Sequence, residues 1–396
     1  MTDFTRTRSL FQLPPGVVYL DGNSLGPPTV STNGALARLV AEDWGEQLIK
    51  SWNNAGWMTL PRRLGDRIGL LVGAPQDSVV IGDTLSIKVF QALAAALDLN
   101  PKRVILSDTG CFPTDLYIAE GLARMLDRGH SLKLVAPEEV FSAIDDEVAA
   151  VLLTEVDYRT ARRHDMKAIT RRAHDAGALT VWDLAHSTGA IPVDLLGAGA
   201  DFAAGCTYKY LNAGPGAPAF VYVAEKHVER VRPALSGWLG HEAPFAFDLD
   251  YRAGPGIERM RVGSPPVVAM TALQDALSVW DVVAIDDVRA ASIALSELFI
   301  SEVERRCPEL ILASPRDPAE RGSHVSFRHG EGYAVMQALI ARGVIGDFRA
   351  PDMMRFGITP LYIGEREIRA AVDVLEDVLT RRVWTAPEYR RKALVT

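Results

Sequence analysis

The stretch that most constrains the fold runs from residue 179 to residue 218. An apolar run, Leu179–Trp182, ends in an acid, Asp183, and a later run of small residues, Ala203–Gly205, leads to Lys209 and a glycine-rich turn. Short apolar runs bounded by turn residues are typical of buried strands. The stretch therefore predicts two neighbouring strands of an α/β sheet. An acid ends one strand, and a lysine lies just beyond the other.

This arrangement favours a particular chemistry. A lysine held at a fixed point suits a Schiff base, because neighbouring groups can lower the pKa of its amine until it is nucleophilic. A carboxylate on a neighbouring strand suits the ring nitrogen of pyridoxal phosphate (PLP), which must stay protonated to withdraw electrons. Alone, Lys209 would be interpreted as a surface lysine. The order Asp183, His186, Tyr208, Lys209 favours the cofactor interpretation.

The motifs around these residues resemble those of the kynureninases, within the aminotransferase class V-like superfamily of PLP enzymes of fold type I. The resemblance rests on DLAHSTGAIPVDL, CTYKYLNAGPG, YLDGNSLGPP, FPTD, GWLGH, VGSPPV and RFGITPLY, so it covers nearly the whole chain. It implies an α/β fold with a large domain, whose mainly parallel sheet is flanked by helices, and a smaller α+β C-terminal domain. It also implies PLP as the cofactor.

The pattern of apolar runs agrees with a doubly wound large domain. No G-x-G-x-x-G follows the first predicted strand, which argues against a dinucleotide site. Helices are expected at 31–50, Ile87–Leu99 and Met166–Ala176. The predicted strands of this domain are Val79–Ile81, Arg103–Leu106, Leu132–Val135, Ala149–Leu153, Leu179–Asp183, Phe202–Cys206 and Ala219–Val223.

The pattern changes after Pro265–Pro266, where long helical segments begin. Helices are expected at Val268–Val282, Ile285–Cys307, Tyr333–Arg342 and Glu365–Arg381, and a strand at His324–Arg328. A chain of 396 residues is long enough for two domains. We predict an N-terminal arm and helix at 1–45, a large PLP-binding domain at 46–265 and a small C-terminal domain at 266–396.

The composition restricts which cellular compartment and which binding partners are expected. The net charge of −8 argues against non-specific nucleic-acid binding. Three widely spaced cysteines without a CxxC pair favour a reducing cytoplasm and no metal site. We find no signal-peptide pattern and no apolar run long enough to cross a bilayer. The sequence thus predicts a cytoplasmic enzyme with neither a nucleic-acid nor a membrane partner.

Several residues are candidates for holding the cofactor. The N–H groups of Leu85 and Ser86 open a helix and suit a phosphate, although plain N-capping by Asp83, Thr84 or Ser86 is the alternative. The FPTD motif would place Phe112 on the face of the cofactor ring and Asp115 near the cofactor. The alternatives are core packing for Phe112 and a helix-start acid for Asp115. The remaining candidates are Pro113, Thr114, Thr154 and His186, the last of which could also be a structural histidine.

Other roles are implied by the resemblance. Arg355 would hold the substrate α-carboxylate, which its fork suits, and Ser24 would lie near it. The alternative for Arg355 is a surface ion pair, and the alternative for Ser24 is a plain turn. Trp52 would belong to the wall around the substrate ring. Trp238 and Ser264 would reach the phosphate of a second subunit, which implies a homodimer with shared sites; Ser264 departs from a frequent asparagine.

The implied reaction is hydrolytic Cβ–Cγ cleavage of L-kynurenine to anthranilate and L-alanine in tryptophan catabolism. Lys209 would carry PLP and move the Cα proton, Asp183 would keep the ring protonated, and Tyr208 would bind phosphate or act as general acid. The choice between kynurenine and 3-hydroxykynurenine stays open. Two rival classes are another PLP enzyme, such as a cysteine desulfurase or aminotransferase, and a catalytically silent protein of the same fold.

Overall fold

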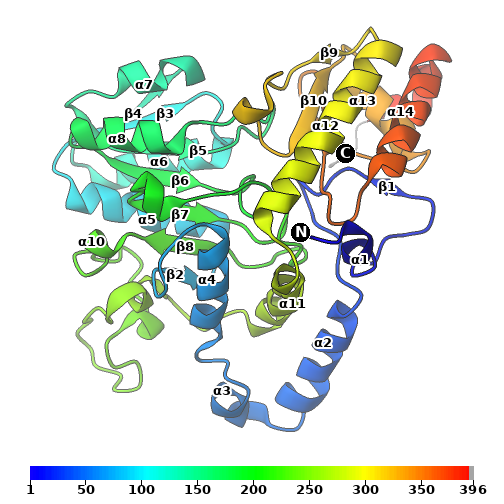
Figure 1. Cartoon of the computed structure of the whole chain (residues 1–396). Helices are drawn as coiled ribbons and strands as arrows, with labels where there is room; N and C mark the ends of the chain where they lie inside the picture. The colour runs from blue at the N-terminus through cyan, green and yellow to red at the C-terminus, as the bar shows by residue number, and fades with distance from the viewer. Residues whose placement is uncertain (392–396) are drawn as a thin grey trace.

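The chain folds into two lobes that lie side by side and meet through loops (Figure 1). The computed structural model describes residues 1–391. In the view of Figure 1, the large sheet lies on the left and the C-terminal lobe on the right. Within the described residues, no single helix is long and apolar enough to cross a membrane. Val267–Asp281 and Ile285–Arg306 meet the length and composition requirements only as a pair bent by 83°.

A seven-stranded sheet forms the centre of the large lobe in the described chain, in the order β2-β8-β7-β6-β5-β3-β4. The strands are β2 (Val79–Ile81), β3 (Val104–Asp108), β4 (Ser131–Val135), β5 (Val148–Thr154), β6 (Leu179–Asp183), β7 (Phe202–Gly205) and β8 (Phe220–Val223). Strands β3 to β7 are mutually parallel, and β8 is antiparallel to both β7 and β2. The predicted mainly parallel α/β sheet is confirmed, with strand boundaries within about two residues.

Alternation along the strands explains why helices cover both faces of this sheet. Val80 and Val181 point to one face, in a buried cluster shared with α5 (Leu85–Leu99) and α6 (Pro113–Leu126). Val79 and Trp182 point to the other face. There they join a cluster shared with α4 (Leu60–Leu71), α8 (Met166–Asp175) and α11 (Val267–Leu277). The carboxyl ends of the parallel strands meet at one edge of the sheet, where ligands bind in such folds.

The C-terminal lobe has its own antiparallel sheet, in the order β12-β13-β10-β9. Its strands are β9 (Ile311–Leu312), β10 (His324–Arg328), β12 (Asp347–Arg349) and β13 (Met353–Gly357), and its helices are α12 (Ile285–Arg306), α13 (Gly332–Ile340) and α14 (Glu365–Thr380). Phe299, Phe327 and Phe356 pack together between the sheet and α12. Arg355 and Asp347 lie directly opposite each other on β13 and β12.

The N-terminal arm joins the C-terminal lobe before reaching the large one. After α1 (Phe4–Arg8), β1 (Val18–Tyr19) pairs in parallel with β11 (Val344–Ile345), and Leu20 is buried in the C-terminal core. The following turn then reaches the lysine segment, where the Gly26 N–H donates to the Tyr208 carbonyl at 2.8 Å. A Cβ on Gly26 would lie 2.3 Å from the Lys209 carbonyl oxygen, so this approach requires glycine.

One expected helix is shorter than the sequence predicted. The span 31–50 contains α2 (Thr32–Arg38), a π-helical turn at Leu39–Trp44 and a 3₁₀ turn at Leu48–Lys50. Gly45 has a low helix propensity, and Leu48 adopts a left-handed φ of 52°, which ends a regular helix. Trp52 lies on the short helix α3 (Ser51–Asn54).

The short helices α7 (Val140–Ala143), α9 (Leu195–Ala198) and α10 (Glu225–Val228) complete the α-helices among residues 1–391. The predicted domain boundaries at 45 and 265 stay predictions.

Candidate active site

Lys209 lies in the loop that follows β7, at the carboxyl edge of the large sheet. Its Nζ is 2.9 Å from Nε2 of His186, which follows the end of β6. Burial lowers the pKa of the Lys209 amine, and burial together with the nearby Lys209 charge lowers the pKa of His186 well below its usual value. His186 is therefore neutral near pH 7, and its Nε2 can accept a hydrogen bond from the Lys209 amine.

Asp183 ends β6 beside Thr154, its parallel neighbour at the end of β5. Its Oδ1 accepts from the Ala185 N–H at 2.8 Å, and the Thr154 hydroxyl donates to Oδ2 at 3.5 Å. Burial raises the pKa of Asp183. It raises that of Asp115, at the start of α6, even more, because Asp183 lies nearby. Such buried carboxyls favour a cationic partner, and a protonated ring nitrogen is one.

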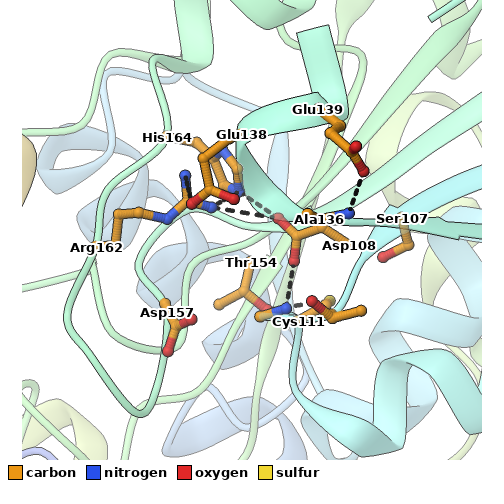
Figure 2. Close-up of polar contacts among 12 residues, drawn as sticks. Ser107, Asp108, Cys111, Ala136, Glu138, Glu139, Thr154, Asp157, Arg162 and His164 are labelled. Carbon is orange, nitrogen blue, oxygen red and sulfur yellow. Dashed lines mark hydrogen bonds and ion pairs between the residues drawn. The ribbon is translucent and has the colours of Figure 1, made fainter. Parts of the chain in front are cut away.

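The loop between β3 and α6 presents Phe112, whose side chain is 40% exposed. Its ring meets Tyr158 edge-on, with centroids 5.1 Å apart. Asp108 holds this loop in place: one oxygen accepts from the Gly110 N–H at 2.8 Å, and the other lies 2.6 Å from His164 Nε2 (Figure 2). An exposed ring on a fixed loop is suited to stack on a planar ligand.

The start of α5 has no side-chain cap. Thr84 is its N-cap and makes no side-chain capping hydrogen bond, so the expected alternative of simple N-capping by that residue is not observed. Asp83, which precedes it, has a left-handed φ of 53° and accepts from the buried Lys88 amine at 3.0 Å. The first N–H groups of a helix that lack a cap attract phosphate. Leu85 and Ser86 belong to this first turn.

The C-terminal lobe contributes Arg355, which is almost fully buried. Its Nε donates to Asp347 Oδ1 at 2.7 Å, its Nη2 donates to Asp347 Oδ2, and Nη2 lies 3.2 Å from the Ser24 hydroxyl. Ser24 in turn donates to Asp347 Oδ2 at 2.5 Å. The structure thus brings Ser24 and Arg355 together, and the ion pair is buried rather than on the surface.

The remaining candidates lie in different surroundings. Tyr208 is partly buried, and burial raises the pKa of its phenol, which therefore stays protonated at neutral pH. Trp238 is 37% exposed and packs edge-on against Phe245. Ser264 lines a small hollow together with Asp83 and Lys88. Trp52 packs against Trp57, and its helix α3 lies at the lower edge of Figure 1. The cross-subunit and ring-wall roles stay predictions.

Sequence reasoning missed several residues of this site. Asp108 and His164 fix the Phe112 loop, Asp347 fixes Arg355, and the His324 ring lies 5.3 Å from that of His186. His324 and Asp347 come from the C-terminal sheet, far along the chain from Lys209. The alternation of residues along these strands was a signal in the sequence. It was not sufficient, because the two side chains can be placed on one face only when the strand register is known.

The residues present fit PLP. Lys209 offers a buried amine whose pKa is lowered, Asp183 offers a buried carboxylate in need of a cation, and the start of α5 offers uncapped N–H groups. These three features match the cofactor's aldehyde, ring nitrogen and phosphate. The fold and this site define the class, which is that of the fold-type-I PLP-dependent enzymes.

Two comparisons specify the family. A family model described as the kynureninase C-terminal domain matches residues 288–375. A protein named kynureninase from Pseudomonas fluorescens is 50% identical over 98% of this chain and 95% of its own length. One from Burkholderia mallei is 49% identical over the same shares. The chain belongs to the kynureninase family.

Solved structures agree on the fold. A cysteine desulfurase from Thermococcus onnurineus superposes with a TM-score of 0.81 at 17% identity, covering 95% of this chain and 98% of its own. A cysteine desulfurase from Escherichia coli gives a TM-score of 0.81 at 18% identity, covering 96% and 99%. At such low identity these matches show the fold alone.

Proposed function

We propose that this protein is a PLP-dependent enzyme that cleaves the Cβ–Cγ bond of L-kynurenine with water, giving anthranilate and L-alanine. The observation that carries the proposal is the buried Lys209 amine, 2.9 Å from a neutral His186. Asp183 ends the adjacent strand. The family membership supplies the substrate, since the relatives carry the name of this activity.

The roles follow from the geometry. Bound PLP supplies an aldehyde for the substrate amine and a ring that withdraws electrons from the bonds to be broken. Asp183 holds the ring nitrogen in its protonated form. Lys209, whose pKa is lowered by burial and whose Nζ lies 2.9 Å from His186 Nε2, removes the proton from Cα. Tyr208 stays protonated and donates its phenolic proton during cleavage of the Cβ–Cγ bond. Arg355 and Ser24 bind the α-carboxylate.

The state of the cysteines supports this reaction over desulfuration. A desulfurase needs a nucleophilic cysteine that can approach the substrate. Cys111, Cys206 and Cys307 are all buried, and burial raises the pKa of each thiol. A thiol that is both buried and fully protonated is a poor nucleophile. Free cysteines also fit the reducing cytoplasm in which we place the enzyme.

The direct test supplies the holoenzyme with L-kynurenine and, separately, with 3-hydroxykynurenine, and follows the fluorescence of the anthranilate product. Equimolar alanine must appear with it, because the hydrolysis yields both. L-cysteine serves as the control substrate, with a sulfide assay. Sulfide release without anthranilate would replace this proposal with the desulfurase alternative. The ratio of the two kynurenine rates decides the substrate preference.

We also propose a homodimer with shared sites. Exposed apolar side chains near α3 and around Trp238 support self-association, among them Trp44, Ile49, Phe245 and Leu249. Two inactive variants, Lys209→Ala and Trp238→Ala, should regain activity when their subunits exchange, since one mixed site is then intact. The test requires that Trp238→Ala be impaired alone. No recovery despite proven exchange would contradict shared sites, and a monomer by light scattering would contradict the dimer.

A further inference from the structure

A buried ion cluster surrounds Asp347, a residue that the proposed chemistry does not yet use. We call Ser24, Asp347, Arg349 and Arg355 the Asp347 cluster. Asp347 is 1% exposed and accepts from both other charged members and from Ser24: Arg349 Nη2 lies at 2.8 Å and Arg355 Nε at 2.7 Å. Burial alone would raise the pKa of Asp347, but these donors hold it below its usual value.

The contacts of Arg355 determine which edge of its fork is available. A guanidinium has five N–H donors in one plane. The Nε–Nη2 edge of Arg355 is filled by Asp347, and Nη1 donates one hydrogen to the Tyr158 carbonyl. The Nη1–Nη2 edge remains, and among residues 1–391 its further contact is the Ser24 hydroxyl at 3.2 Å. That edge is the one that can bind a second carboxylate in bidentate fashion.

The charges of the cluster are also suited to an anion. One carboxylate, Asp347, faces two guanidinium groups, so the cluster carries one net positive charge. A substrate carboxylate would neutralise it. Without Asp347, the buried Arg355 and the partly exposed Arg349 would lie side by side without the anion that orients them, which is a costly arrangement for the buried cation.

We propose that Asp347 is a positioning residue for substrate recognition: by filling one edge of Arg355, it directs the Nη1–Nη2 edge to the substrate α-carboxylate. The proposal rests on the proposed function, in which Arg355 binds that carboxylate. It adds that selectivity for a carboxylate depends on Asp347 as much as on Arg355.

The test uses two ligands that differ only in the carboxylate. One is kynurenine without its α-amino group. The other is the same aryl ketone without the amino group and without the carboxylate. Neither has an α-amino group, so neither can enter the PLP-dependent reaction, and each is measured as a competitive inhibitor of the holoenzyme. The ratio of their inhibition constants reports the preference for a carboxylate, free of the chemical steps.

In Asp347→Asn the side chain keeps its shape, but its amide N–H₂ cannot accept from Arg355. The preference for the carboxylate ligand should fall by about tenfold or more, since a fixed bidentate charged contact is lost. The constant for the neutral ketone should change by less than about twofold, because it does not use this edge. Asp352→Asn, which removes the same charge from the β12–β13 hairpin, is the control and should leave the preference unchanged. An unchanged or increased preference in Asp347→Asn would overturn the proposal.

A second variant covers the case in which Asp347→Asn fails to fold, as judged by its thermal midpoint and PLP absorbance. Arg349→Gln changes a partly exposed partner of Asp347 and removes the net positive charge. It should lower the preference by about threefold, and no change would overturn the proposal. A third variant, Arg355→Leu, distinguishes a failure of the proposed carboxylate role of Arg355 from a failure of the proposed role of Asp347. If Arg355→Leu keeps the preference, the carboxylate role of Arg355 is wrong. If Arg355→Leu loses it while Asp347→Asn keeps it, only the role of Asp347 is wrong.

Discussion

The candidate active site has two walls, one on each lobe, and they are built in contrasting ways. On the large lobe, Lys209, His186 and Asp183 come from adjacent strand ends, and burial leaves their charges poorly compensated. On the other wall, Arg355 comes from the C-terminal sheet and Ser24 from the N-terminal arm, and their polar groups are already paired through Asp347. One wall is a set of groups with perturbed pKa values, and the other is a paired network that keeps one net positive charge.

This difference matches the two tasks. A group that moves protons needs a pKa near the working pH, which burial without a strong partner provides. A group that only recognises a carboxylate needs a fixed direction, which a saturated ion pair provides. Substitutions on the large lobe should therefore change turnover, while substitutions on the other wall should change substrate affinity.

The largest effect is expected for Lys209→Ala. Turnover of kynurenine to anthranilate should be abolished, because the variant lacks the amine that lies beside His186 and moves the Cα proton. The fold should persist, as judged by circular dichroism. Lys167→Ala, an exposed lysine on α8, is the control. Near-normal activity in Lys209→Ala would contradict the division between the two walls.

Asp183→Asn should remove most of the turnover while PLP stays bound. The amide keeps the hydrogen bond to the Ala185 N–H but no longer pairs a charge with the ring nitrogen. The measurement is the turnover number beside the cofactor absorbance, with Asp175→Asn on the exposed side of α8 as the control. A turnover number equal to that of the wild type would exclude Asp183 from this role.

Arg355→Leu should raise KM by about a hundredfold or more and change cofactor affinity little, since a bidentate charged contact is worth a few kcal/mol. Arg328→Leu, an exposed residue on the neighbouring strand β10, is the matched control. Equal loss of PLP affinity in Arg355→Leu would mean that the residue is structural, and the contrast between the walls would disappear.

A change of pH should have a smaller effect on the binding of the carboxylate ligand. Burial and the charge of Asp347 raise the pKa of Asp21 to about 7. Asp21 is therefore neutral below about pH 7 and anionic above it, and an anion there repels a bound carboxylate. The charged or titratable groups facing it are Asp347, Arg349, Arg355, Tyr19, Tyr210 and Tyr362.

The preference for the carboxylate ligand over the neutral ketone should fall several-fold as the pH rises from about 6 to about 8. Asp21→Asn removes the titrating carboxyl and should make the preference flat over this range. The tyrosines have pKa values raised by burial and do not titrate there. An identical pH profile in wild type and Asp21→Asn would exclude Asp21 as the cause.

The same contrast explains what the sequence could predict. The large sheet and the Lys209 wall were predicted well, because each residue ends an apolar run and parallel strands bring their carboxyl ends together. Asp347 could not be recognised, because its segment, GDFRAPD, has the composition of a turn. Its function depends on the pairing of β12 with β13 and on the arm reaching Ser24, which are contacts between distant segments. Local patterns do not encode such contacts.

The central claim is that Lys209 is the residue that carries the cofactor. Reduction of the holoenzyme with borohydride fixes PLP to whichever lysine holds it, and mass spectrometry of the peptides then locates that lysine. The chain offers a real competitor in Lys88, which is also buried, has a pKa lowered by burial, and lies near the phosphate end of the site. We predict the adduct on the peptide containing Lys209. An adduct on Lys88, or none on any lysine, would contradict this assignment.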